Sequence, residues 1–404
     1  MFGKTRIGIM GTGNIASVMA ATLKKQKGVK LYAVGSRTQE RADEFAKNYG
    51  AAKAYGSYAD LAADLKVELI YVATPHSEHF ENVKLCITNN KPVLCEKAFM
   101  LNERQAKTIF DYARDKNVYV CEAMWTRFMP FMSTIKEVLG SGIIGEPTML
   151  TANLGYNIIG KQRITSTELG GGALLDVGVY TINFASMIFG DEIADISSIA
   201  SYAETHVDVQ DSITLRYKNG KMAVLNCSAL SKSDRQGVIY GTNGYMIIEN
   251  INNFESLSVY NNENKKTAFY KRPGQISGYE YEVAASIKAI KEGWLESPMM
   301  PHNETLKMLN IMDFVRKQIG VHYAADEVTK ITLSEEAMKA EMEDKVTVVE
   351  APKSEEIVEE APKVEEKDTS SSETTPIEVK QDAPNSLEGA GSEAAEDNAS
   401  STEE

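Results

Sequence analysis

The fold is decided by residues 6–16, which read RIGIMGTGNIA. A short apolar strand ends at Gly11, and apolar residues then recur at helical spacing until Gly28. In this GxGxxA motif Gly11 allows a tight turn, Gly13 lets the backbone approach a pyrophosphate, and Ala16 lets helix and strand pack closely. Because helix N–H groups face an anion here, we favour a dinucleotide-binding turn over glycines needed only for the backbone. The residues expected to contact the cofactor are Gly11, Thr12, Gly13, Asn14 and Ile15.

The alternation of strand and helix repeats through the first 122 residues. Such units wind right-handed into a doubly wound parallel sheet covered by helices. We therefore expect an N-terminal Rossmann domain over residues 1–123. The apolar runs predict strands at 29–35, 51–55, 67–73, 92–95 and 118–121, and the helical patterns between them include 102–116.

From about Trp125 the rhythm changes to that of an antiparallel sheet. Asn219-Gly220 and Asn243-Gly244 are strong signals for hairpin turns. Strands are predicted at 148–154, 211–217, 221–229, 237–240, 245–249 and 257–260, and helices at 172–188, 279–291 and 304–318. The expected fold class is α/β, with a second domain over 124–333 built on a large, open, mainly antiparallel sheet. A short helical connector is expected over 334–345.

Charge is distributed unevenly along the chain, whose formal net charge is −14. Residues 346–404 hold 17 acids and four lysines, so the remainder is almost neutral and offers no net positive charge for nucleic acid. This segment has no aromatic residue and repeats Ala-Pro-Lys-x-Glu-Glu at 351 and 361, which is typical of a disordered acidic tail. A tail that is merely solvated is favoured over a tether or a partner-docking segment.

The composition is that of a globular protein, with 43% hydrophobic and 25% charged residues. No apolar run approaches the roughly 18 residues that a membrane-spanning helix needs, so no membrane contact is expected. The four cysteines have no CxxC spacing and no nearby histidine cluster, so neither a metal nor a redox dithiol is expected. The N-terminus shows no signal-peptide pattern, which predicts a cytoplasmic protein.

Ser36-Arg37 follows the second predicted strand, where an NAD site would carry a carboxylate for the ribose hydroxyls. A hydroxyl and a guanidinium suit a 2′-phosphate, so NADP is favoured and NAD stays possible. The other interpretation is that Ser36 caps the next helix, with Gln39 completing a capping box. Glu40 is the nearest acid and falls inside that helix.

Two further strand ends lie at the crevice where such sheets bind ligands. Thr74, as a helix N-cap, and Pro75, at the first helical position, close the fourth strand. His76 and His79 would share one helix face near the nicotinamide, although each could instead be an ordinary surface residue. Glu96-Lys97 follows the fifth strand, where a lysine could bind a substrate hydroxyl or lower the pKa of a neighbouring phenol.

In the second domain, Asp176 and Tyr180 are one helical turn apart and point the same way. The pair is a candidate for proton transfer, while buried tyrosines that bond a carboxylate are also common in cores.

The chain resembles the Gfo/Idh/MocA family of NAD(P)-dependent oxidoreductases, and within it the branch of dihydrodiol and NADP-dependent D-xylose dehydrogenases. The resemblance runs from about Arg6 to Glu327 and rests on residues 8–16, 73–76, 95–99, 122–128, 171–180 and 311–313. It implies a Rossmann domain, a second domain whose open sheet often forms a dimer interface, and a catalytic role for Lys97. Ala98 replaces the proline of the family's Glu-Lys-Pro motif, and Tyr180 stands where other members carry histidine.

The expected reaction is hydride transfer between nicotinamide and a hydroxyl- or carbonyl-bearing carbon of a sugar, polyol or cyclic diol, coupled to one proton transfer. In one version Tyr180 exchanges the proton, Lys97 lowers the phenol's pKa, and Asp176 holds Lys97 or a substrate hydroxyl. In the other, Lys97 is the direct acid/base and Tyr180 orients the substrate. A dinucleotide-binding sensor without activity is the alternative function. The expected substrate pocket is lined by Trp125, Arg127, Phe128 and Tyr156.

Overall fold

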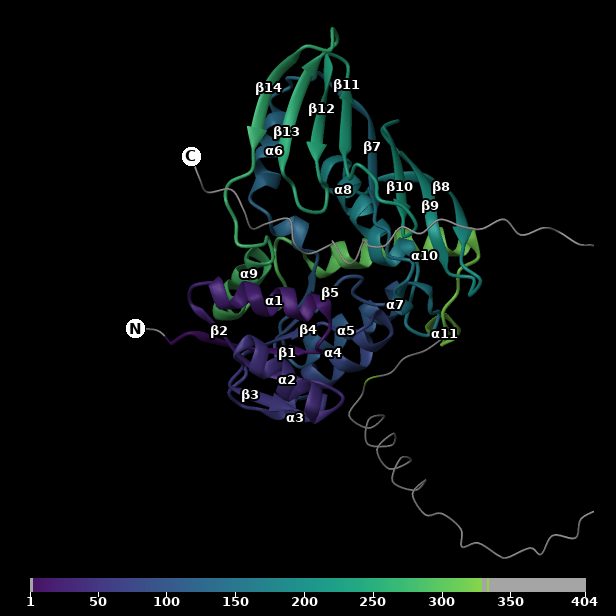
Figure 1. The fold of residues 1–404 in the computed structure, drawn as a ribbon. Helices are drawn as coiled ribbons and strands as arrows, with labels where there is room; N and C mark the ends of the chain where they lie inside the picture. Colours follow the sequence, from purple (N-terminus) through teal and green to yellow (C-terminus); the bar gives the residue numbers. More distant parts are fainter. Residues whose placement is uncertain (1–2, 329–332, 334–404) are drawn as a thin grey trace, which may run out of the picture. The chain divides into compact units, whose positions relative to one another are not determined.

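The computed structural model describes residues 3–328 and 333, and its first sheet is the predicted parallel Rossmann sheet (Figure 1). Within the described residues the strand order is β3-β2-β1-β4-β5-β6, with every pair parallel. The order reverses between β1 and β4, so the ligand crevice of such a sheet lies at their carboxyl ends. The strands are β1 (Thr5–Met10), β2 (Val29–Gly35), β3 (Lys53–Tyr55), β4 (Leu69–Val72), β5 (Val93–Glu96) and β6 (Val120–Ala123).

Helices connect these strands, and each buries an apolar stripe against the sheet. In α5 the Asn102 side chain accepts the N–H of Gln105, and the helix buries Ile109 and Phe110. Capping by asparagine supplies a partner for one of the helix's free N–H groups. The helices are α1 (Asn14–Lys25), α2 (Gln39–Tyr49), α3 (Tyr58–Ala63), the 3-10 turn η1 (His76–Glu78), α4 (His79–Thr88) and α5 (Glu103–Asp115).

The second sheet is large and mainly antiparallel, as predicted. Within the described residues its order is β14-β13-β12-β11-β7-β10-β9-β8, and only β7 and β10 pair in parallel. The strands are β7 (Pro147–Gly155), β8 (Ile193–Tyr202), β9 (Asp208–Tyr217), β10 (Met222–Ser228), β11 (Gly237–Gly241), β12 (Gly244–Glu249), β13 (Ser256–Asn261) and β14 (Lys266–Lys271).

One face of this sheet is buried and the other is open. Burial alternates along β10 and β12, so successive side chains point to opposite faces. The apolar helix α8 packs on the buried face. Helix α10 contacts both α8 and α5, a helix of the first domain. The remaining helices are η2 (Trp125–Phe128), α6 (Phe131–Gly140), α7 (Gln162–Thr165), the π-helical turn η3 (Leu174–Gly178), α8 (Val179–Phe189), α9 (Glu280–Lys291), α10 (His302–Ile319) and α11 (Ala324–Glu327).

The strands β8 and β14, the turn η2 and the helices α6, α7 and α11 were not predicted, and one predicted helix has an unexpected geometry. β8 and β14 are edge strands with few buried side chains, so their alternation of apolar and polar residues is weak. The helix expected over 172–188 begins as the π-helical turn η3 and continues as α8. None of the described helices is long and apolar enough to cross a bilayer. The predicted connector over 334–345 and acidic tail over 346–404 lie outside the described residues.

Two capping predictions are wrong by one or two residues. Thr38, and not Ser36, caps α2, because its hydroxyl accepts the N–H of Arg41. Ser36 instead turns inward and is 3% exposed. At the end of β4, Pro75 occupies the N-cap position of η1, so helical geometry starts one residue later than expected from Thr74.

Candidate active site

The glycine turn after β1 has the shape that a dinucleotide needs. Gly11 has φ +109°, and a Cβ there would lie 2.7 Å from the carbonyl oxygen of Ala73 on the neighbouring strand end. Gly13 has ordinary extended backbone, and no protein atom lies within 4 Å of the place a Cβ would take. The turn therefore leaves open space in front of the N-terminus of α1, where N–H groups face an anion. Thr12, Asn14 and Ile15 complete this turn.

Two hydroxyls and two guanidinium groups gather at the end of β2. The Ser36 hydroxyl lies 3.4 Å from that of Thr12. Burial raises the pKa of the Tyr58 phenol, and the charges of Arg37 and Arg41 act in the opposite direction, so both cations are near enough to influence this phenol. Sequence reasoning missed Arg41, which lies in the first turn of α2, while Arg37 precedes the helix.

His76 and His79 both hold the backbone around Lys97. The His76 ring contacts the carbonyl oxygens of Gly170 at 2.9 Å and Lys97 at 3.2 Å. His79 is fully buried, and its ring contacts the carbonyls of Thr74, Ala98 and Phe99. Their rings lie edge to face, as the shared helix face predicted. These contacts give both residues a positioning role for the segment that carries the lysine.

Burial and the neighbouring His79 lower the pKa of His76 to about 3, and burial lowers that of His79 as well. Both imidazoles are therefore neutral near pH 7, and each has a single N–H, so only one nitrogen of each ring donates to a carbonyl oxygen. The Thr74 hydroxyl accepts a hydrogen bond from the side-chain amide of Asn82. Pro75, the next residue, is exposed.

Lys97, from the first domain, contacts Asp176, from the second. The sequence predicted that Asp176 holds either Lys97 or a substrate hydroxyl, and the structure shows the contact with Lys97. The Lys97 ammonium donates to the Asp176 carbonyl oxygen at 2.7 Å and to Oδ1 at 3.1 Å. Their side chains are only 12% and 8% exposed. Burial alone would raise the pKa of Asp176, but Lys97 and Arg163 hold it well below its usual range. The carboxylate is therefore charged and fixes the ammonium in place.

Arg163 is a residue of this site that sequence reasoning missed. It lies in α7, and its Nη1 donates to the same Oδ1 of Asp176 at 2.8 Å. Lys97 and Arg163 thus share one carboxylate oxygen. An arginine among exposed polar residues carries no local signal of such a contact.

The turn that carries Asp176 is held by a buried carboxylate. Asp208 accepts the backbone N–H of Leu174 at 2.5 Å, and a Cβ at Gly172 would lie 2.4 Å from Asp208 Oδ1. Gly172 has φ +120°, a conformation that favours glycine. The glycine triplet before the helix therefore allows this close approach.

Tyr180 lies beside Lys97, with the ammonium 5.1 Å from the centre of its ring. Its phenol oxygen accepts a hydrogen bond from Trp125 Nε1 at 3.0 Å. Trp125 in turn stacks on Tyr279, with ring centres 4.1 Å apart and planes 3° from parallel. The two aromatic residues form a wall next to the Lys97 and Asp176 pair, and sequence reasoning missed Tyr279.

Lys97 does not bring the pKa of Tyr180 below its usual value, which the version with Tyr180 as the acid/base requires. Burial, Tyr279 and Glu96 together raise the pKa of this phenol well above its usual value. A buried phenol without a hydrogen-bond donor strong enough to offset burial keeps its proton. Tyr180 is therefore a neutral hydroxyl near pH 7.

Glu96 is buried beside the lysine that follows it in the chain. The Tyr71 hydroxyl donates to its Oε1, and the N–H of Lys97 donates to Oε2 at 3.3 Å. Burial raises the pKa of Glu96 although Lys97 lowers it. The nearby Glu282 is fully buried, and within the described residues neither of its carboxyl oxygens has a hydrogen-bond partner. Burial disfavours the charged form of both carboxyl groups, whereas two cations stabilise the carboxylate of Asp176.

The predicted substrate-pocket residues separate into two groups. Trp125 lies in the aromatic wall, and Tyr156 donates to Asn252 Oδ1 at 3.0 Å and acts electrostatically on Tyr279.

Arg127 does not contact the aromatic wall in the described structure. Its guanidinium contacts Asn183, Ser186 and Glu304 and joins η2 to α8 and α10. Phe128 is a buried core residue, so the structure gives these two a bracing role.

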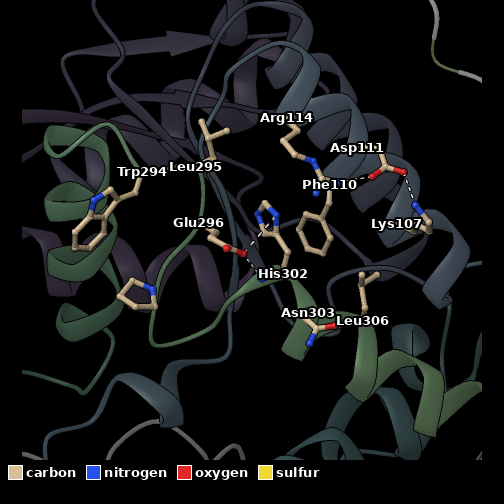
Figure 2. A pocket seen from close by; sticks show the side chains of 11 residues that line it. Lys107, Phe110, Asp111, Arg114, Trp294, Leu295, Glu296, His302, Asn303 and Leu306 are labelled. Carbon is tan, nitrogen blue, oxygen red and sulfur yellow. Dashed lines mark hydrogen bonds and ion pairs between the residues drawn. The ribbon is translucent and has the colours of Figure 1, made fainter.

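One well-defined cavity lies away from this site. It measures about 730 Å³ and lies between α5 and α10 (Figure 2). The His302 ring in its wall stacks on Phe110 with centres 3.9 Å apart, and Phe110 stacks on Phe99. None of the predicted site residues lines it.

The arrangement can bind a dinucleotide and move one proton. Lysine has three donor hydrogens, and two of those on Lys97 are held by Asp176. Within the described residues the third donor and the Tyr180 O–H proton have no partner, so both can reach a substrate oxygen.

Comparison with known proteins agrees with this geometry. The family described as "Oxidoreductase family, NAD-binding Rossmann fold" matches residues 5–123, and the "GFO/IDH/MocA C-terminal domain" matches residues 132–247. Trans-1,2-dihydrobenzene-1,2-diol dehydrogenase from Mus musculus is 34% identical over 334 residues, covering 80% of this chain and 98% of the relative. The Homo sapiens protein of that name is 32% identical over 329 residues, with the same coverage.

Solved structures share the fold. A 3-ketoreductase from Actinomadura kijaniata in complex with NADP and TDP-benzene has a TM-score of 0.72 at 22% identity, covering 78% of this chain and 98% of that one. An aldose-aldose oxidoreductase from Caulobacter crescentus complexed with glycerol has a TM-score of 0.71 at 18% identity, covering 78% and 97%. The relatives are dehydrogenases, which sets aside a sensor without activity. The chain therefore belongs to the Gfo/Idh/MocA family and is an NAD(P)-dependent oxidoreductase that acts on CH–OH groups.

Proposed function

We propose that the chain transfers a hydride between NADP and a hydroxyl- or carbonyl-bearing carbon of a sugar, a polyol or a cyclic diol. The observation that carries this proposal is the Lys97 ammonium, fixed by Asp176 and lying 5.1 Å from the Tyr180 ring at the carboxyl end of β5. When bound, the nicotinamide supplies or accepts the hydride. The aromatic wall of Trp125 and Tyr279 suits the C–H face of a ring.

The protein's own part is to place the substrate oxygen and move its proton. Lys97 acts as the direct acid in the reducing direction, because its third N–H is free to give a proton to the oxygen. Tyr180 donates a hydrogen bond to the same oxygen and stays neutral. Asp176 keeps the ammonium oriented, and His76 and His79 keep the lysine's backbone in place.

NADP is the proposed cofactor. Ser36 and Arg37 replace the carboxylate that would bind the ribose hydroxyls of NAD, and Arg41 adds a second cation beside Tyr58. Guanidinium groups bind phosphate through several parallel hydrogen bonds. Gly11, Thr12, Gly13, Asn14 and Ile15 would hold the pyrophosphate, and the backbone near Thr74 and Pro75 would line the path to Lys97.

A homodimer through the open face of the second sheet is also proposed. This face carries a groove of about 600 Å³ along β7, β8, β9 and β10. Asn226 donates to Asn153 across two strands, and Ile199 is 73% exposed beside them. Ile199→Asp would then give monomers in size-exclusion chromatography with light scattering, and an unchanged mass would contradict the dimer.

The central experiment measures reduced cofactor by its absorbance. The full chain is mixed with NADP or NAD and with aldoses, polyols, cyclic diols and, in the reverse direction, dicarbonyls. Lys97→Met serves as the control for background. Turnover that needs Lys97 supports the proposal, and no turnover on any class, with cofactor binding verified by calorimetry, contradicts it.

A further inference from the structure

We propose that Arg163 is the specificity-determining residue of this site and binds a carboxylate on the substrate, so that the chain acts on sugar acids in preference to neutral sugars. The inference rests on the proposed function and names its substrate class. Its basis is the contact that Arg163 shares with Lys97 on one oxygen of Asp176.

The position of Arg163 places a second cation next to the reacting group. Lys97 Nζ and Arg163 Nη1 contact the same oxygen at 3.1 and 2.8 Å, so the two nitrogens lie within about 6 Å of each other. A sugar that bonds to Lys97 through one hydroxyl can therefore bond to Arg163 through a second group across its ring.

Arg163 also has unused donors. Its guanidinium carries five N–H donors in a planar fork. Nη1 binds Asp176, while Nε and Nη2 make no hydrogen bond to any residue that the structure describes. The side chain is 43% exposed, against 12% for Lys97 and 8% for Asp176. An exposed fork edge beside a buried ion pair is suited to bind a carboxylate by two parallel hydrogen bonds.

The short helix α7, which presents Arg163, is anchored through the next residue, Ile164. Ile164 is fully buried, and its carbonyl oxygen accepts the N–H of Gly172 at 2.9 Å. A Cβ at Gly171 would lie 2.5 Å from the same carbonyl oxygen. The guanidinium therefore projects from a fixed point, which reduces the entropy lost when it binds a ligand.

The local charge favours an anion. Two side-chain cations, Lys97 and Arg163, share the single carboxylate of Asp176. Within the described residues Asp176 is the one carboxylate that Arg163 contacts, and a carboxylate on the substrate would pair with the remaining N–H donors of its guanidinium.

The test compares acids with neutral sugars that differ at one carbon. D-glucuronate is paired with D-glucose, and D-galacturonate with D-galactose, on the full chain with NADP. The variants are Arg163→Met, Arg163→Lys, and Lys161→Met as a matched control, because Lys161 is an exposed cation two residues away without a side-chain partner in the described residues. Binding of D-glucuronate and D-galacturonate is measured separately by calorimetry.

The expected wild-type kcat/KM is at least tenfold higher for an acid than for its neutral partner. Arg163→Met should abolish this ratio through a higher KM for the acid, Arg163→Lys should keep part of it, and Lys161→Met should keep all of it. Any loss of Asp176 positioning lowers both substrates equally and leaves the ratio unchanged.

Three results would overturn the inference: no preference for acids in the wild type, an equal loss on both substrates in Arg163→Met, or an equal effect of Lys161→Met. If neither sugar is turned over, the proposed function fails. Calorimetry then decides the inference alone, since binding of the acids that disappears in Arg163→Met upholds it and no binding to the wild type rejects it.

Discussion

Trp125 donates its indole N–H to the phenol oxygen of Tyr180 at 3.0 Å, so the phenol's own proton is left for a substrate. The direction of this hydrogen bond is fixed because an indole nitrogen can only donate, and stacking on Tyr279 holds the indole ring in place. The phenol is thereby a donor and not a base.

Tyr180→Phe should lower kcat by roughly tenfold to a hundredfold and leave the pH dependence of kcat unchanged. The reason is that burial raises the pKa of Tyr180 well above its usual value, so it does not titrate near neutrality. Steady-state rates between pH 5 and 9 test this. Disappearance of one limb of the profile in the variant would show that the phenol is the acid/base.

Asp176→Asn should lower kcat and destabilise the fold, because the buried Lys97 ammonium loses its charged partner; breaking a buried pair typically costs about 3 kcal/mol. The folded-state pKa of Asp176 lies below the usual 3.8, so its stabilisation is complete above pH 3.8 and is lost as the pH falls further. Urea unfolding at pH 3 to 7 should show the difference between wild type and variant shrinking at the acidic end. A constant difference would contradict the ion pair.

His76→Gln should remove part of the acid sensitivity of the fold. The pKa of His76 falls from 6.5 in the unfolded chain to about 3 in the fold, so its contribution to stability is present above pH 6.5 and declines as the pH drops toward 3. Unfolding free energies measured at pH 4, 5, 6 and 7 should therefore slope less in the variant. Equal slopes would mean that the imidazole titrates normally.

Gly13→Val should affect cofactor binding, and Gly11→Ala should affect the stability of the fold. The valine enters open space at a residue with extended backbone, so it should weaken NADP binding without loss of stability. The alanine meets the Ala73 carbonyl oxygen at 2.7 Å and requires φ +109°, so it should destabilise the fold. Calorimetric titration and thermal unfolding separate the two, and a Gly13→Val protein that binds NADP as the wild type does would remove the turn from the cofactor site.

Arg37→Ala should weaken NADP binding by roughly tenfold to a hundredfold and leave NAD binding unchanged, since the lost guanidinium contacts only a 2′-phosphate. Titration of both nucleotides into the same preparations makes NAD the internal control. An equal loss for both would place Arg37 outside the cofactor's phosphate site.

Much of the fold was predictable from the sequence because its signals are local. The GxGxxA turn, the βα repeats and the hairpin turns each depend on residues within about a dozen positions. The strands β8 and β14 were missed since edge strands bury little, and the Ser36 cap was wrong because Ser36 packs inward beside Thr12.

The site was predictable only in part. The resemblance to a family indicated Lys97, Asp176 and Tyr180, and the structure brings them together. Tyr279 was missed because it stacks on Trp125, which lies far from it in the chain. Arg163 lies 13 residues from Asp176, and it was missed because an arginine among exposed polar residues carries no local signal of such a contact. The direction of the Tyr180 pKa was wrong since it depends on burial, which residue spacing does not reveal.

The His76 ring joins the carbonyl of Lys97 to that of Gly170, and the ammonium of Lys97 closes on Asp176 nearby. A fragment that ends at Ala123 would contain the glycine turn and the lysine, yet one imidazole nitrogen would lose its partner and the ammonium its counter-ion. The nucleotide-binding domain thus carries the reactive lysine, but the second domain supplies the groups that hold it in position.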